Sequence, residues 1–228
     1  MKNKPSYTKS SLILGFMFAI LFTHLPVVYT LLYHNLTGAP TSVDGSIDVT
    51  ETSPERSIVL DGKWEFYWNR LIVTDRHPDK KPDFLISVPD YWSGYTIDGN
   101  QLPAGGYGSY RLIIRGLDYS SPVTAFVPDF GSAYRIFIDG VLAAESGNVS
   151  KVSKEVITVP KSQIYPVKLS EKEEHEIVVE VATKRFSGLY KAPVLKDYSR
   201  AANGEDNSRH TVYPVRNSAV FIFYSDCH

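Results

Sequence analysis

The chain has 228 residues, with 24 basic and 25 acidic side chains and a formal net charge of −1, so no global field attracts nucleic acid or an acidic surface. Its hydrophobic content of 43% and aromatic content of 13% allow a packed core and exclude wholesale disorder. The single cysteine, Cys227, excludes an internal disulfide, and the six histidines are scattered without metal-ligand spacing. We therefore expect a fold held by packing, with no metal and no cofactor.

An uncharged apolar run, residues 12–33, follows a basic N-terminus, residues 1–11, that carries three lysines. At about 1.5 Å per residue, a helix of this length spans a hydrocarbon core of about 30 Å. The positive-inside rule then predicts a cell-membrane anchor with its N-terminus in the cytoplasm and everything after Tyr33 outside the cytoplasm. A cleaved signal peptide is the alternative, but the long run and the lack of a good small-x-small site favour an uncleaved anchor.

Residues 34–56 are predicted to be a linker. The stretch TGAPTSVDGSIDVTETSP is rich in Thr, Ser, Gly, Pro and acids, a composition that indicates a flexible spacer. The globular domain is expected at residues 57–197, followed by a C-terminal tail at residues 198–228.

Short apolar or alternating stretches recur along this domain, as β-strands do. The expected strands are residues 63–68, 110–115, 123–127, 134–138, 141–144, 155–159 and 176–181. Asp139-Gly140 supplies the positive φ angles of a tight type I′ hairpin turn. Gly- and Pro-rich stretches separate the strands, and after Tyr33 no window keeps helical periodicity beyond about two turns. The pattern predicts an all-β fold, an antiparallel β-sandwich or jelly roll.

Six motifs follow one another within the domain. They are LDGKWEFYW at 60–68, VPDYWSGY at 88–95, GYGSYRL at 106–112, VPDFGSAYRIFIDG at 127–140, AESG at 144–147 and EIVVEVA at 176–182. Their order and spacing resemble the extracellular domain of bacterial seven-transmembrane receptors with diverse intracellular signalling modules. The resemblance implies a galactose-binding-like jelly roll ahead of a membrane bundle that feeds a kinase or cyclase.

The sugar-binding β-sandwich of β-galactosidase-like and β-glucuronidase-like glycosidases shares part of this pattern. The predicted anchor, together with residues 128–129 and 132–134, favours the receptor family. The chain departs from that family at Thr183-Lys184, where Ser-Asn is expected. It also carries only a seven-residue apolar run, residues 218–224, where a membrane bundle should begin. That run is either the start of a truncated first helix or a last β-strand or frayed tail.

Aromatic residues in the loops are the main candidates for ligand binding. Trp92, Tyr95 and Tyr107 lie in Gly- and Pro-rich stretches, where they can stack on a sugar. Trp92 has an alternative interpretation as a plug in one end of the sandwich. Arg111 is a candidate clamp for an anionic ligand or a partner in a strand-surface ion pair. Asp129 completes the candidate ligand-binding set.

No catalytic signature is visible. Asp90, Asp98, Asp118 and Asp129 lie in turn-like stretches, where Asp serves structure, and no nucleophile elbow, phosphate loop or zinc motif occurs. The sequence therefore predicts a non-enzymatic, membrane-tethered sensor domain that binds a carbohydrate or small molecule and relays a signal. A sugar-binding domain of a glycosidase-like enzyme and a protein-interaction domain are the alternatives. Nucleic acid is not an expected partner.

Overall fold

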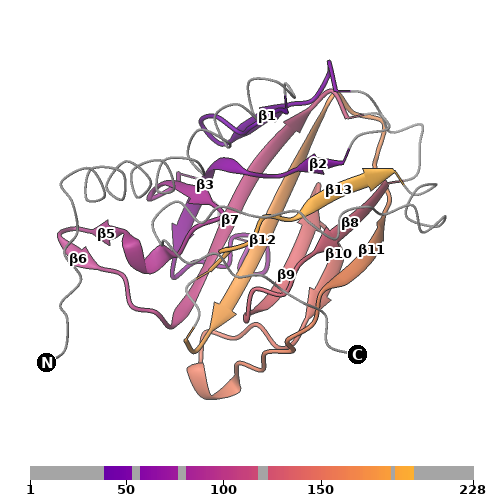
Figure 1. Cartoon of the computed structure of the whole chain (residues 1–228). Coiled ribbons are helices and arrows are strands. Elements are labelled where there is room, and N and C mark those ends of the chain that lie inside the picture. Colours follow the sequence, from indigo (N-terminus) through magenta and orange to yellow (C-terminus); the bar gives the residue numbers. More distant parts are fainter. Residues whose placement is uncertain (1–38, 53–56, 77–80, 118–122, 186–187, 198–228) are drawn as a thin grey trace, which may run out of the picture. The chain divides into compact units, whose positions relative to one another are not determined.

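A computed structural model describes residues 39–52, 57–76, 81–117, 123–185 and 188–197. The chain divides into two units, residues 1–39 and 40–228, and the described strands all belong to the second (Figure 1). Within the described ranges, no helix is long and apolar enough to cross a membrane. The predicted anchor and the apolar run near the C-terminus lie outside the described residues.

The strands form two main sheets. The larger sheet is ordered β10 (Val141–Ser146), β9 (Ala133–Ile138), β12 (Glu174–Thr183), β7 (Gly106–Arg115), β3 (Gly62–Trp68) and β4 (Phe84–Val88), all antiparallel neighbours, with β1 (Ser46–Asp48) parallel to β7. The smaller sheet is ordered β11 (Gln163–Val167), β8 (Val123–Val127), β13 (Val194–Asp197) and β2 (Ile58–Val59). A hairpin of β5 (Thr96–Ile97) and β6 (Asn100–Gln101) and two 3₁₀ turns, η1 (Trp92–Gly94) and η2 (Ser153–Glu155), complete the described elements.

The core lies between these two sheets. Tyr110, Leu112 and Ile114 of β7 alternate into it, as the sequence predicts, and all three are fully buried. Ala125 of β8 and Leu195 of β13 belong to the same cluster from the opposite sheet. The predicted antiparallel β-sandwich is therefore confirmed for the described residues.

The outer face of the larger sheet has a small core of its own. Tyr67, Ile72, Phe137 and Val178 pack together there. Residues 70–76 are fastened over this face by the fully buried carboxylate of Glu180. This carboxylate accepts hydrogen bonds from the backbone N–H groups of Val73 (3.0 Å) and Thr74 (2.8 Å) and from the Thr74 hydroxyl. A buried carboxylate needs such donors, so the segment and Glu180 depend on each other.

The predicted linker is wrong in its described part. Residues 46–48 form β1, and Ile47 and Val49 are buried in the core. The stretch as a whole is polar, and this hides the inward positions of Ile47 and Val49. A three-residue strand needs only one or two inward side chains.

The expected strand at residues 155–159 is also wrong. Residues 153–155 form η2, and Ile157 makes only a single bridge, to Asn148. Val156 is buried against Ala133 and Ala182, but Ile157 is 60% exposed and Val159 is 43% exposed, so the stretch does not continue as a strand.

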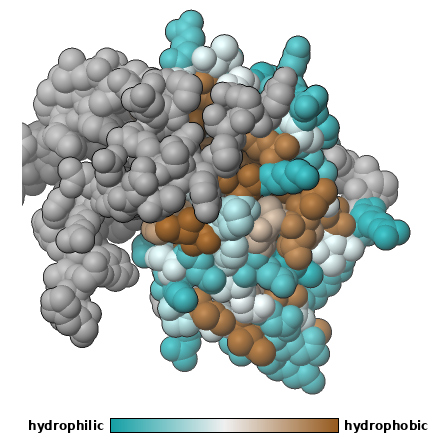
Figure 2. Space-filling model, turned by 90° about the vertical axis from the view of Figure 1, so that its right-hand side faces the viewer, coloured by the Kyte–Doolittle hydropathy of each residue, from teal (hydrophilic) through white to brown (hydrophobic). Residues whose placement is uncertain are grey.

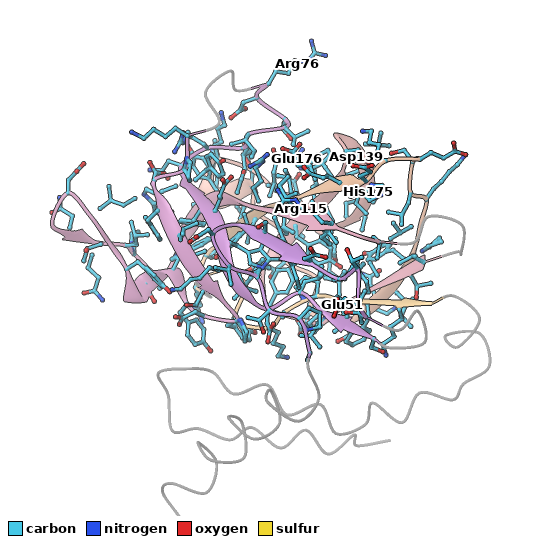
Figure 3. All side chains as sticks on the ribbon, turned by 90° about the horizontal axis from the view of Figure 1, so that it is seen from above. Glu51, Arg76, Arg115, Asp139, His175 and Glu176 are labelled. Carbon is cyan, nitrogen blue, oxygen red and sulfur yellow. The ribbon has the colours of Figure 1, made fainter. Side chains whose placement is uncertain are left out.

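The predicted hairpin turn is confirmed. Asp139 and Gly140 have φ angles of 51° and 79° and connect β9 to β10. The Asp139 carboxylate also accepts hydrogen bonds from Nδ1 of buried His175 (2.9 Å), the Ser170 hydroxyl (2.9 Å) and the backbone N–H of Glu176 (3.1 Å). Figure 3 labels Asp139, His175 and Glu176, which lie close together. Burial raises the pKa of Asp139, but these hydrogen bonds outweigh it and hold the pKa below its ordinary value.

Asp139 should therefore give the fold a specific sensitivity to acid. A depressed folded-state pKa contributes stability that is complete above the unfolded pKa of about 4 and is lost as pH falls through the folded pKa. We expect Asp139→Asn to unfold at lower urea concentration than the wild type at pH 7. The gap between the two midpoints should narrow steadily below about pH 4. A gap that stays constant down to pH 2.5 would contradict this role.

Candidate ligand-binding site

Trp92 plugs one end of the sandwich. Its side chain is fully buried, and its ring lies 5.2 Å from that of Trp68, edge-on, and 5.9 Å from that of Phe66. The indole Nε1–H donates to the carbonyl of Pro103 at 2.8 Å, so the one polar atom of the ring is satisfied inside. This placement agrees with the core interpretation of Trp92 and leaves no open ring face for a ligand.

Two loops are tied together directly beside this plug. The backbone N–H of Asp90, after β4, donates to the carbonyl of Leu189, after β12, at 3.0 Å. The N–H of Leu189 in turn donates to the hydroxyl of fully buried Tyr110 at 3.2 Å. Burial raises the pKa of that hydroxyl far above its ordinary value, so it stays neutral and available as an acceptor. The loops are thus held to each other and to the central strand β7.

Gly188 makes this close approach possible. It has a φ of +89°, and a Cβ atom at this position would lie 2.9 Å from Cε3 of Trp92 and would overlap the Tyr110 hydroxyl. A side chain here would therefore be strained by its backbone and blocked by its neighbours. Only glycine lets the 188–193 segment lie against the plug.

The hydrogen bond between Asp90 and Leu189 brings the next residue of each loop together. Tyr91 and Tyr190 stack with ring centroids 5.1 Å apart and planes inclined by 22°, and both are half-buried. We call these two residues the tyrosine pair. The Nζ of Lys191 lies 5.7 Å from the Tyr190 centroid, within the range of a cation–π contact. The end of the sandwich thus carries partly exposed aromatic rings on a fixed backbone.

Tyr95 and Asp90 fix the loop that carries Tyr91. The Tyr95 ring stacks on Phe84 at 5.2 Å, and its hydroxyl donates to the Asp90 carboxylate at 3.1 Å. The same hydroxyl accepts from the backbone N–H of Ser87 at 3.0 Å. Asp90 is itself buried and also accepts from the N–H of Tyr91. Tyr95 is therefore adjacent to the site, but both its ring and its hydroxyl are used to fix the loop.

The other predicted site residues lie elsewhere. Tyr107 packs on the outer face of the larger sheet against Ala133, Val156 and Ala182, a cluster separate from the one that Trp92 and Tyr95 join. The predicted convergence of Tyr107 with Trp92 and Tyr95 on one stacking platform is therefore not found.

Arg111 is held between two carboxylates. Its Nη1 lies 2.7 Å from Glu65 and its Nε 2.6 Å from Glu176. Each bidentate face of the guanidinium therefore has one donor already engaged by a carboxylate, which agrees with the ion-pair interpretation rather than the clamp.

Asp129 closes a local turn. Its carboxylate accepts from the N–H of Gly131 at 2.8 Å, and its own N–H donates to the Ser162 hydroxyl at 3.0 Å. This is the structural role that aspartate commonly has in turns.

Sequence reasoning missed the tyrosine pair. Tyr91 stands inside the motif at 88–95, one position before the tryptophan that drew attention, and Tyr190 stands outside every motif. Their partnership depends on a contact between residues about a hundred positions apart, for which the local sequence holds no signal.

Comparison with known proteins finds solved structures that resemble this chain, but no family to which it belongs. No family model matches the chain, and no curated protein matches it. Among solved structures, a GH2 β-galacturonidase from Eisenbergiella tayi is 12% identical, with a TM-score of 0.44 over 64% of this chain and 25% of that one. The β-glucuronidase of Ruminococcus gnavus is also 12% identical, with a TM-score of 0.46 over 61% of this chain and 28% of that one. The chain thus spans about a quarter of the length of these glycosidases, and a likeness at this level assigns no activity.

Replacing Trp92 should cost stability. Removing a fully buried indole leaves a cavity between the loops and the core, so we expect Trp92→Ala to lower the free energy of unfolding by about 3–5 kcal/mol. Val141→Ala serves as the control, because Val141 is 70% exposed and its loss should stay within about 0.5 kcal/mol. Urea unfolding of the full chain measures both. Equal, small effects of the two substitutions would show that Trp92 is not a plug.

Proposed function

We propose that the β-sandwich is a non-catalytic recognition domain that binds a carbohydrate or a similar small polyol at the tyrosine pair. The observation that carries this proposal is the stacking of Tyr91 on Tyr190, fixed by the backbone hydrogen bond between Asp90 and Leu189. Aromatic rings held in place before the ligand arrives favour binding, because little entropy is lost on ordering them. Sugars present C–H faces that stack on tyrosine, and a small number of polar groups then fix orientation.

A binding role rather than catalysis agrees with the state of the nearby carboxylates. Asp90 is buried and committed to Tyr91 and Tyr95, and Asp98 has a φ of 50° in the turn between β5 and β6. Glycosidic hydrolysis requires two carboxyl groups facing each other across an open cleft, roughly 5–9.5 Å apart. Asp90 is not available for that arrangement because its carboxylate is buried and engaged, and the turn position of Asp98 is one that aspartate commonly occupies for structure.

The setting we propose for this domain is extracytoplasmic. It rests on the basic N-terminus and the apolar run at residues 12–33, which predict a membrane anchor, and on the motif order that resembles receptor ectodomains. In that setting, ligand binding would be relayed to a signalling module encoded in a longer protein. The glycosidase alternative places the same binding domain beside a catalytic barrel, and the coding sequence downstream of residue 228 distinguishes the two.

Truncation of the tyrosine pair tests the proposal. A panel of mono- and oligosaccharides titrated calorimetrically into the full chain should include a binder. Tyr91→Ala and Tyr190→Ala should each weaken its binding by on the order of 1–3 kcal/mol, the scale for stacked anchors. Tyr107→Ala is the matched control, since it removes a half-buried tyrosine on another face and should leave the affinity unchanged. Loss of affinity in the control and not in the pair would move the site to the outer face of the larger sheet.

A further inference from the structure

The loop between β12 and β13 is basic. Its described residues, 184–185 and 188–193, include Lys184, Arg185 and Lys191 and no acidic side chain. Lys184 and Arg185 are exposed, and Lys191 is half-buried. The whole chain has a net charge of −1, so this concentration of cations is a local feature that the overall composition hides.

Cations on the outer face of the larger sheet are used differently. Arg111, Arg115 and Arg135 each have a nitrogen within 3.3 Å of a carboxylate, so their charges are compensated inside the fold. In the part of the chain that the structure describes, neither Lys184 nor Arg185 forms an ion pair. The charges of these two side chains therefore remain available to an anionic ligand.

The basic loop runs around the Trp92 plug. A Cβ atom on Gly105 would lie 2.7 Å from the carbonyl oxygen of Lys184, so the two backbones are in contact. Gly105 comes two residues after Pro103, whose carbonyl accepts the indole N–H of Trp92 at 2.8 Å. At its other end the loop returns to the same indole ring at Gly188. The cations and the tyrosine pair are thus arranged around one buried side chain.

Lys191 brings a charge directly to the tyrosine pair. It follows Tyr190 in the chain, and its Nζ lies 5.7 Å from the centroid of that ring. Lys184 precedes Lys191 by seven residues, so their Cα atoms are at most about 25 Å apart. A ligand of several sugar units that stacks on the pair is therefore long enough to meet more than one of these cations.

Acidic groups on the neighbouring segment do not cancel these charges. Residues 88–106 contain two acids, Asp90 and Asp98. Asp90 is buried, and its carboxylate accepts from the N–H of Tyr91 and the hydroxyl of Tyr95. Asp98 is exposed in the turn of the β5–β6 hairpin. Three cations therefore stand against one exposed carboxylate, which makes the surroundings of the tyrosine pair electropositive.

We propose that the tyrosine pair takes an acidic carbohydrate, one whose sugar units carry carboxylate or sulfate groups. This inference rests on the proposed function, because it names the class of ligand for the same site. A sugar ring stacks on a tyrosine, and the lysine and arginine side chains bind the anionic groups by charge-assisted hydrogen bonds. Opposite charge also speeds encounter and favours acidic over neutral partners.

Two tetrasaccharides that differ in charge test the inference in the full chain. A mannuronate tetramer and the mannose tetramer of the same linkage are titrated calorimetrically at low salt. We expect the acidic tetramer to bind at least tenfold more tightly. This advantage should shrink as salt is added, because the Debye length falls from about 10 Å at 0.1 M to about 3 Å at 1 M. A sulfated mannose tetramer, run in parallel, shows which anionic group the site prefers.

Lysine substitutions connect the preference to this loop. Lys184→Met and Lys191→Met should each lower the ratio of the two affinities, acidic over neutral, about threefold, the scale of an exposed charge pair. Lys168→Met is the matched control, because Lys168 is an exposed lysine that follows β11. It precedes β12, whose ten residues separate it from Lys184 by about 30 Å. β11 lies on the side of the domain that faces the viewer in Figure 2, where apolar and hydrophilic residues are interspersed.

Each outcome bears on one of the two proposals. Equal affinities for the neutral, carboxylated and sulfated tetramers would overturn the acidic class and leave recognition at the tyrosine pair standing. An equal fall of the ratio in Lys168→Met would also overturn it, because attraction would then come from overall charge. Tyr91→Ala should weaken every tetramer that binds. If no tetramer binds, or if Tyr91→Ala changes nothing, the proposed function itself fails and the inference fails with it.

Discussion

The candidate site depends on one backbone hydrogen bond, from the N–H of Asp90 to the carbonyl of Leu189. It joins the loop after β4, at the edge of the larger sheet, to the loop after β12, near its centre. Without it, Tyr91 and Tyr190 would sit on two unconnected loops and would lose rotational freedom only when a ligand arrived. The hydrogen bond is shielded from solvent because Trp92, Tyr110 and Leu189 around it are fully buried. Breaking a hydrogen bond in such surroundings is costly.

The hydrogen bonds of Asp90 explain why its buried carboxylate is tolerated at this end of the sandwich. Its oxygens accept from the N–H of Tyr91 and the hydroxyl of Tyr95, so the charge is solvated by fixed donors in place of water. The Tyr95 ring then continues onto Phe84, which links the loop to the core. Asp90 and Tyr95, whose side-chain types suit a catalytic acid and a sugar-stacking ring, thus hold the loop in place.

The sequence predicted the long strands well. The run at 110–115 alternates between buried and more exposed residues, because one of its faces lines the core. The run at 176–181 was recognised from its apolar and β-branched content, although both of its faces are largely buried. The strands β4, β11 and β13 were not predicted, since each is short and its inward side chains are buried only by partners distant in the chain. The site followed the same rule: Trp92 was located by its motif, but its burial and the pairing of Tyr91 with Tyr190 arise only from tertiary contact.

Hydrogen exchange of two backbone amides tests this account most directly. If the loops are joined as described, the amides of Asp90 and Leu189 should exchange as slowly as those of Leu112 and Ile114 in β7, because all four are released only by global unfolding. Exchange of the Asp90 and Leu189 amides at rates typical of open surface loops, with β7 still protected, would show that the two loops move independently. The tyrosine pair would then not exist before binding, and the proposed site would lose its foundation.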